Sequence, residues 1–213
     1  MKRTYRLCAG ILLLFTAFLL LASGVREKNA ALAERTGEKI LRFHVLADSD
    51  LAKDQAVKLD VRDLLLQMIQ DGFSGTAPDA VSKRAVQTYV LGHKTALEQA
   101  ANDLLASQGF SYQAAIRLER CTFPSRTYGG VTFPAGTYDA VRVLLGKGEG
   151  QNFWCVLYPS LCYLDSARAV MPDASQNVLK NLLPEDDFAA LLSSGKRPDV
   201  RIRLKLLEFF PGK

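Results

Sequence analysis

Two aspartates near the start of the chain stand in a pattern that can support phosphoryl transfer. Asp48 and Asp50 directly follow an alternating apolar stretch that predicts a strand. In phosphoaspartate phosphatases, one such carboxylate attacks phosphorus and the second acts as acid and base. Those sites also need a threonine or valine next, whereas Leu51 follows here, and a calcium loop fails because Leu59 replaces the bidentate glutamate. We therefore expect Asp48, Ser49 and Asp50 to cap the helix that follows.

A series of alternate glycines resembles a phosphate-binding loop. A dinucleotide-binding fingerprint needs a strand, the glycine turn and then a helix whose N-terminus holds the anion. Gly146, Gly148 and Gly150 are instead followed by residues 153–158, whose composition is that of a strand. We expect an antiparallel hairpin between residues 138–145 and 153–158, with the glycines at its tip.

Nucleophilic catalysis finds little support among the histidines and cysteines. The chain has no Gly-x-Ser-x-Gly elbow and two histidines. We expect His44 to be a satisfied or surface residue of a strand and His93 to cap a helix break, although a Cys155–His44 dyad stays open. No CxxC pair exists, and no cysteine stands at zinc-ligand spacing from a histidine. We expect no metal, no cofactor and no enzymatic activity.

The composition indicates one globular domain without nucleic-acid binding. The chain has 213 residues, 48% of them hydrophobic and 23% charged. Its formal charge of +5 owes much to Lys2, Arg3 and Arg6, which lie in a stretch of 24 residues without any acid. The rest carries 24 basic against 22 acidic residues, so the main support for a nucleic-acid partner disappears.

The first 24 residues have the pattern of a secretory signal. A basic segment precedes the apolar run 7–22, and the small residues at 22–24 suit signal peptidase. We expect residues 1–24 to be a signal peptide, with an uncleaved anchor as the alternative. Residues 25–37 would then form a linker, and residues 38–213 a single domain that works outside the cytoplasm.

The remaining periodicity predicts an α+β fold, with helices packed on a mixed or antiparallel sheet. The elements expected are strands at 40–46, 112–118, 138–145, 153–158 and 200–210, helices at 52–70, 79–90, 93–107 and 184–194, and a structured loop at 123–136.

Three cysteines remain after the signal, in a compartment that permits disulfides. A turn at Pro159 would bring Cys155 and Cys162 within bonding distance, and we expect this disulfide. The alternative is that both are buried free thiols. Cys121 offers either of them another partner.

Three sequence blocks together resemble one protein family. The blocks are Ile40-Leu41-Arg42-Phe43-His44-Val45-Leu46-Ala47-Asp48-Ser49-Asp50 with Asp54-Gln55, then Phe123-Pro124-Ser125-Arg126-Thr127-Tyr128-Gly129 with Phe133-Pro134-Ala135-Gly136-Thr137-Tyr138, and the long block from Gly146 through Asn152-Phe153-Trp154-Cys155 to Cys162. Over roughly residues 38–165 they resemble the stage II sporulation protein R family of endospore-forming Firmicutes. Phe153 stands where that family usually has a second tryptophan, and Cys121 is outside its pattern.

The resemblance implies a signalling protein of sporulation. It implies synthesis in the forespore and export into the space between the forespore and mother-cell membranes. There the protein would activate a membrane-embedded aspartic protease, which processes pro-sigma factor E in the mother cell. A secreted envelope hydrolase and a structural envelope protein are the alternatives.

We expect the partner to bind at the hairpin and its exit. Glycines allow a close backbone approach, and aromatic side chains are typical binding anchors. Alternation should place Phe153, Cys155 and Leu157 on one face of the strand and Trp154, Val156 and Tyr158 on the other, unless both faces are core. The predicted partner-binding residues are Gly148, Gly150, Asn152, Phe153, Trp154 and Tyr158.

Overall fold

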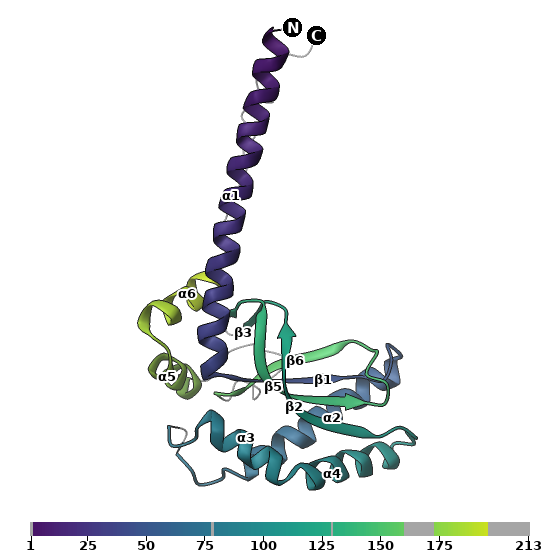
Figure 1. Cartoon of the computed structure of the whole chain (residues 1–213). Coiled ribbons are helices and arrows are strands. Elements are labelled where there is room, and N and C mark those ends of the chain that lie inside the picture. The colour runs from purple at the N-terminus through teal and green to yellow at the C-terminus, as the bar shows by residue number, and fades with distance from the viewer. Residues whose placement is uncertain (1, 78, 129, 160–172, 196–213) are drawn as a thin grey trace, which may run out of the picture.

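The protein is an α+β fold with a long N-terminal helix, as the computed structural model shows (Figure 1). The structure describes residues 2–77, 79–128, 130–159 and 173–195. Its elements are α1 (Lys2–Lys39), β1 (Leu41–Leu46), α2 (Ala52–Asp71), α3 (Lys83–Gly92), α4 (Lys94–Ser107), β2 (Ala114–Phe123), β3 (Arg126–Tyr128), β4 (Val131–Phe133), β5 (Gly136–Leu145), β6 (Asn152–Tyr158), α5 (Asp173–Leu182) and α6 (Glu185–Gly195). The expected strand at 200–210 lies outside the described residues.

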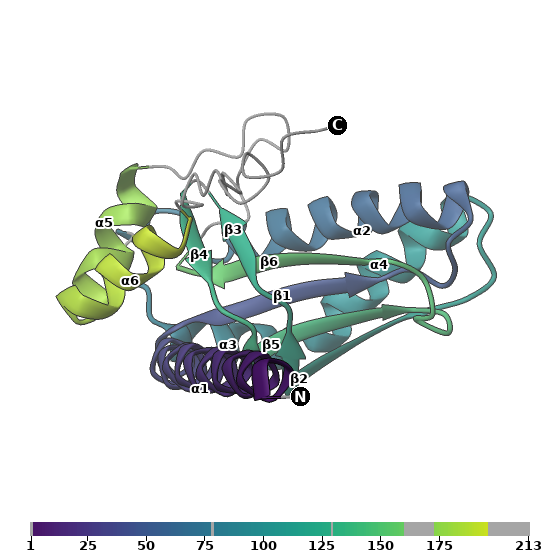
Figure 2. The same ribbon diagram turned by 90° about the horizontal axis from the view of Figure 1, so that it is seen from above.

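The main sheet is mixed and has the strand order β2-β5-β1-β6 (Figure 2). β1 is parallel to β5 and antiparallel to β6, and β2 is antiparallel to β5. The hairpin expected between β5 and β6 is therefore wrong, because β1 lies between these strands. All six residues of β1 are buried, which fits a central strand covered on both faces.

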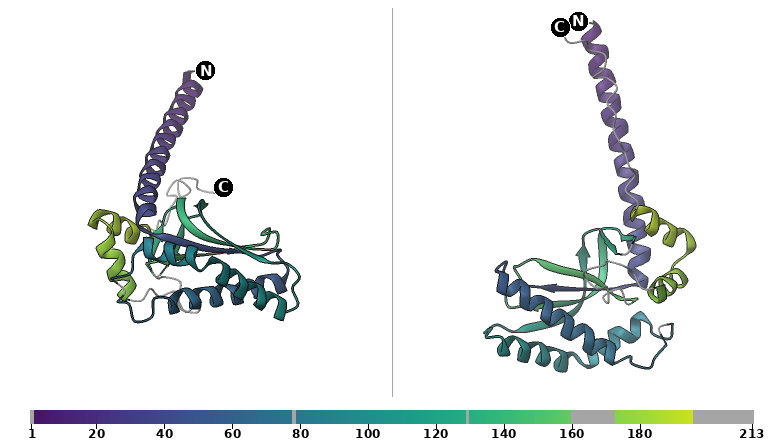
Figure 3. Two further views of the ribbon diagram at one scale, coloured as in Figure 1. Left: turned by 60° about the horizontal axis from the view of Figure 1, so that its bottom comes forward. Right: turned by 180° about the vertical axis from the view of Figure 1, so that it is seen from behind.

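Three helices cover one face of the sheet (Figure 3). The predicted helix at 52–70 is α2, and the predicted break between two helices falls at His93, between α3 and α4. Gly109 (φ +82°) ends α4 in the left-handed conformation that glycine adopts without strain. These helices and the sheet enclose the helix-side core, whose buried members include Phe43, Val61, Leu65, Leu97 and Val143.

The opposite face has a second core at one end. There the short pair β3–β4 packs over the main sheet, and Phe123, Val131 and Phe133 are fully buried. The loop expected at 123–136 is therefore wrong, since its apolar residues are core. The second core includes Leu32, Phe123, Phe133, Tyr138 and Val156.

The expectation that residues 25–37 form a linker is wrong, because α1 continues through them to Lys39. Leu32 and Ala33 are buried in the second core together with Leu179, Leu183 and Leu191 of the C-terminal helices. α5 was not predicted from the sequence, whereas α6 is the predicted helix at 184–194. The role of residues 1–24 as a signal stays a prediction. Among the described residues, no helix is long and apolar enough to cross a membrane.

Candidate functional site

The glycine-rich loop 146–151 wraps around the segment that follows β1. The Gly150 amide donates to the carbonyl of Ala47 (2.9 Å). Two aspartates of this segment accept from loop amides: Asp48 Oδ1 from Lys147 and Asp50 Oδ1 from Gln151, each at 2.7 Å. The loop therefore crosses the end of β1 and carries the chain from β5 to β6.

The expected capping role of Asp48, Ser49 and Asp50 is wrong. Leu51 is the N-cap of α2, and it makes no side-chain capping hydrogen bond. The two aspartates bind the glycine loop instead, where they accept from the amides of Lys147 and Gln151. Aspartate is favoured both at the start of a helix and where a side chain binds the amides of a loop. The sequence pattern therefore does not distinguish these two roles.

Two of the glycines are explained by the backbone of this loop. Gly148 has a φ of +67°, a conformation that strains other residues. A Cβ on Gly150 would clash with the carbonyl group of Ser49. The conformation of the loop therefore requires glycine at 148, and the crossing of two backbones requires it at 150.

Replacing Gly150 with alanine should destabilise the protein by roughly 1–3 kcal/mol, because the new methyl group meets backbone that must move. Urea unfolding of the purified protein measures this loss. Gly92→Ala is the matched control, since a Cβ there meets nothing within 4 Å. Equal free energies of unfolding for the two variants would contradict the close contact between Gly150 and the backbone of Ser49.

A buried carboxylate joins the same segment to α2. Asp54 is 2% exposed. It accepts hydrogen bonds from Ser49 Oγ and, at 2.8 Å, from Tyr112 Oη. The bond from Ser49 holds the pKa of Asp54 below its usual range, and burial raises the pKa of Tyr112. The carboxylate is thus ionised and engaged, as expected for a structural group.

The predicted partner-binding residues of β6 are divided between the two cores. Trp154 packs on the second core and Phe153 on the helix-side core, where Arg62 lies over its ring at 4.6 Å. The predicted alternation continues as far as Leu157. It is wrong for Tyr158, which joins the helix-side core because the β1–β6 register shifts between Leu41 and Arg42.

His44 lies beside Cys121 rather than Cys155. Cys121 Sγ is 3.7 Å from His44 Nε2, and the imidazole stacks on the Trp154 ring with centroids 4.8 Å apart. Burial, aided by the charge of Arg142, lowers the pKa of His44 to about 4, and burial raises the pKa of the Cys121 thiol. Both groups are neutral at pH 7. They do not form the thiolate–imidazolium pair that a cysteine nucleophile uses.

Cys155 is a buried thiol that donates weakly to the carbonyl of Val156 (3.8 Å). Cys162 lies outside the described residues. The Cys155–Cys162 disulfide therefore stays a prediction.

Arg42 is a buried charged residue that sequence reasoning did not single out. It is fully buried, with its guanidinium 4.4 Å from the Phe123 ring centroid and 5.0 Å from that of Tyr138. Its Nη2 also donates to Tyr128 Oη at 3.4 Å. The sequence did carry a signal for this position. Arg42 stands between Leu41 and Phe43 in the alternating strand, so its side chain must lie on the opposite face of β1 from theirs.

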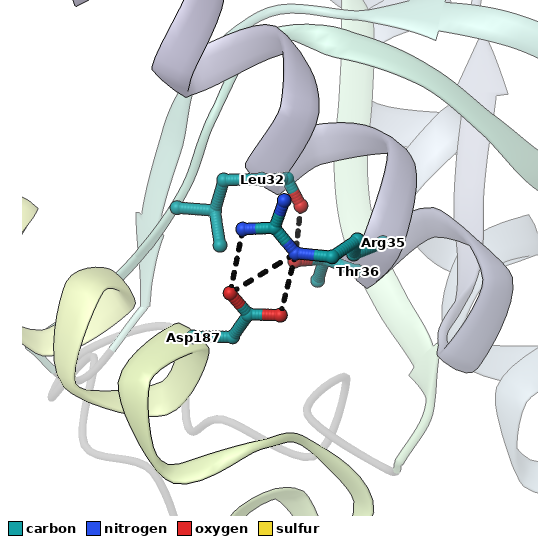
Figure 4. Close-up of polar contacts among 4 residues, drawn as sticks. All are labelled: Leu32, Arg35, Thr36 and Asp187. Atoms are coloured by element: carbon teal, nitrogen blue, oxygen red, sulfur yellow. Dashed lines mark hydrogen bonds and ion pairs between the residues drawn. The ribbon is translucent and has the colours of Figure 1, made fainter.

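An ion pair joins α1 to α6 (Figure 4). Arg35 Nε donates to Asp187 Oδ2 (2.9 Å), and its Nη2 donates to Oδ1 (2.7 Å). The Arg35 hydrogen bond holds the pKa of Asp187 below its usual range. Within α1, the neighbouring Thr36 Oγ1 donates to the carbonyl of Leu32 (2.6 Å). The Arg35–Asp187 ion pair thus fixes the end of α1 to α6.

The described part of the chain holds no cluster of three or more His, Cys, Asp or Glu side chains that could bind a metal ion.

Comparison with known proteins gives two matches. The family model described as stage II sporulation protein R matches residues 37–168, the part of the chain that contains the whole main sheet. Stage II sporulation protein R of Bacillus subtilis (strain 168) is 28% identical over 169 residues, which cover 78% of this chain and 73% of the relative. No solved structure matches.

Proposed function

Because this chain belongs to the stage II sporulation protein R family, we propose that it is an exported signal which activates the membrane-embedded aspartic protease that processes pro-sigma factor E. Family membership by itself makes it a sporulation stage II protein. The forespore would export it, and it would meet the protease in the space between the forespore and mother-cell membranes. The observation that carries this proposal is the family match over the sheet domain.

We propose that the protein acts by binding rather than by catalysis. The described groups that could do chemistry are engaged in structure. Asp54 is buried between Ser49 and Tyr112, and the His44–Cys121 pair is neutral. We therefore propose a protein partner, and no cofactor, small-molecule substrate or nucleic acid.

Export is assigned to the first 24 residues, whose basic and apolar segments suit a secretory signal. A disulfide between Cys155 and Cys162, formed after export, would hold the end of β6 in one register. The secretory signal and the disulfide are both part of the proposal.

Co-expression in a host that does not sporulate tests the function. The cells contain the protease, pro-sigma factor E and either this full chain or a form that begins at residue 25. Processing should require the full chain, because the leaderless form stays in the wrong compartment. Processing without this chain, or equal processing with the leaderless form in intact cells, would contradict the proposal.

A further inference from the structure

The two faces of the main sheet are covered to different extents. α2, α3 and α4 cover one face along its length (Figure 3). On the other face, the described elements β3, β4, α1 and α6 gather at one end (Figure 1). The rest of that face, which we call the polar face, carries half-buried or exposed side chains around the buried His44. They are Ala115, Arg117, Glu119, Arg142, Leu144, Asn152 and Trp154.

Strand register places a row of side chains across the polar face. Arg142 on β5 pairs with Arg117 on β2 and with His44 on β1. His44 in turn pairs with Trp154 on β6. Two arginines, a histidine and a tryptophan therefore lie side by side across all four strands.

The hydrogen bonding of this row is incomplete. Arg142 Nη1 donates to Glu119 Oε1 (2.8 Å), whereas the buried Nε of Arg142 has no hydrogen-bond partner. His44 is 3% exposed, and its Nδ1 also has no partner. A buried donor without an acceptor is costly, and a guanidinium binds a carboxylate more strongly than a neutral group.

The charge of the polar face favours an acidic ligand. Arg117 is exposed on the edge strand, and Glu119 forms an ion pair with Arg142. Half-buried Trp154 lies at the other end of the row, where it stacks on His44, the residue between it and Arg142. Tryptophan and arginine are both enriched among binding hot spots.

Three of the predicted partner-binding residues lie on or next to this face. Asn152 and Trp154 share one face of β6, and a Cβ on Gly148 would contact Leu144 and Leu46 at the end of the same face. Phe153 and Tyr158 belong to the helix-side core. The structure thus separates the predicted residues into those that can meet a partner and those that pack inside.

We propose that the polar face is the docking surface of the protein, and that it binds an acidic segment of its protein partner. A carboxylate of that segment pairs with Arg142 and Arg117, and an apolar side chain further along the same segment packs on Trp154. This inference rests on the proposed signalling function and adds the surface and the chemistry of recognition.

Charge reversal in the co-expression system tests the surface. Arg117→Glu, on an exposed side chain, should lower processing roughly tenfold when the signalling protein is limiting, because it repels an acidic segment. Arg142→Gln should also weaken processing. Arg84→Glu is the matched control, since Arg84 is exposed on α3 beneath the other face, and it should process as the wild type does.

Photocrosslinking separates this inference from the proposed function. Benzoylphenylalanine at exposed Ala115 of the polar face should crosslink to the protease, whereas the same group at exposed Thr95 of α4 should not. Wild-type processing together with unaffected Arg117→Glu and Arg142→Gln variants would overturn the docking surface and leave the function standing. A crosslink from position 115 to a second copy, or to this chain's own residues, would also overturn it. Absence of wild-type processing would instead count against the function.

Discussion

A chain that begins at residue 38 should be less stable than one that begins at residue 25, by at least about 3 kcal/mol. The turns of α1 between these positions contain Leu32, Ala33 and Thr36, which are 5%, 2% and 0% exposed. Their removal opens the second core beside Leu183 and leaves buried Asp187 without Arg35. The described side chains of residues 12–23 are exposed, so the form beginning at residue 25 should keep its stability. Urea unfolding of both purified forms measures the difference.

A point substitution makes the same comparison without shortening the chain. Leu32→Asp places a charge in the second core and should unfold the protein at lower urea, because a buried unpaired charge is strongly disfavoured. Val25→Asp is the control, since Val25 is 59% exposed on the same helix. Equal unfolding midpoints for the two variants would show that residues 25–37 form a linker and do not pack in the second core.

The helices of the sheet domain could be predicted because their signals are local. The apolar positions of α2 recur with the helical period, and Gly109 ends α4 with the expected positive φ. α6 begins with three acidic residues that complement its dipole. Each signal lies within the element that it defines.

The error over β5 and β6 has a non-local cause. Two strands separated by a glycine-rich turn usually pair with each other. Here β1, from a distant part of the sequence, inserts between them, and Asp48 and Asp50 bind the connecting loop. The sequence contains both partners of this crossing, but their contact depends on the assembled sheet.

The candidate site was only partly predictable for the same reason. The aromatic strand and the glycines were recognised, whereas the row through Arg142 and His44 requires three strand registers at once. Likewise, the packing of α1 depends on Asp187, which lies 152 residues beyond Arg35. Spacing along the chain carries no information about such pairs.

The free energy of unfolding should fall by roughly 3 kcal/mol between pH 7 and pH 4 through His44 alone. Burial, and the charges of Arg142 and Arg42, lower the pKa of this imidazole from 6.5 to about 4, and Glu119 opposes them only in part. The unfolded chain therefore binds a proton in this range that the folded protein does not bind. The contribution of His44 to the free energy of unfolding is fully present above pH 6.5 and is lost as the pH falls towards 4.

Urea unfolding at several pH values between 7 and 4 measures this slope, and His44→Phe should flatten it. Phenylalanine can keep the stacking on Trp154, so the change of slope reports the lost proton even where stability at pH 7 also changes. Asp54 and Asp187, whose pKa values are lowered from 3.8, act in the same direction from about pH 5 downwards, so the upper part of the window reports His44 most directly. An unchanged slope in His44→Phe would mean that the imidazole reaches water in the folded protein.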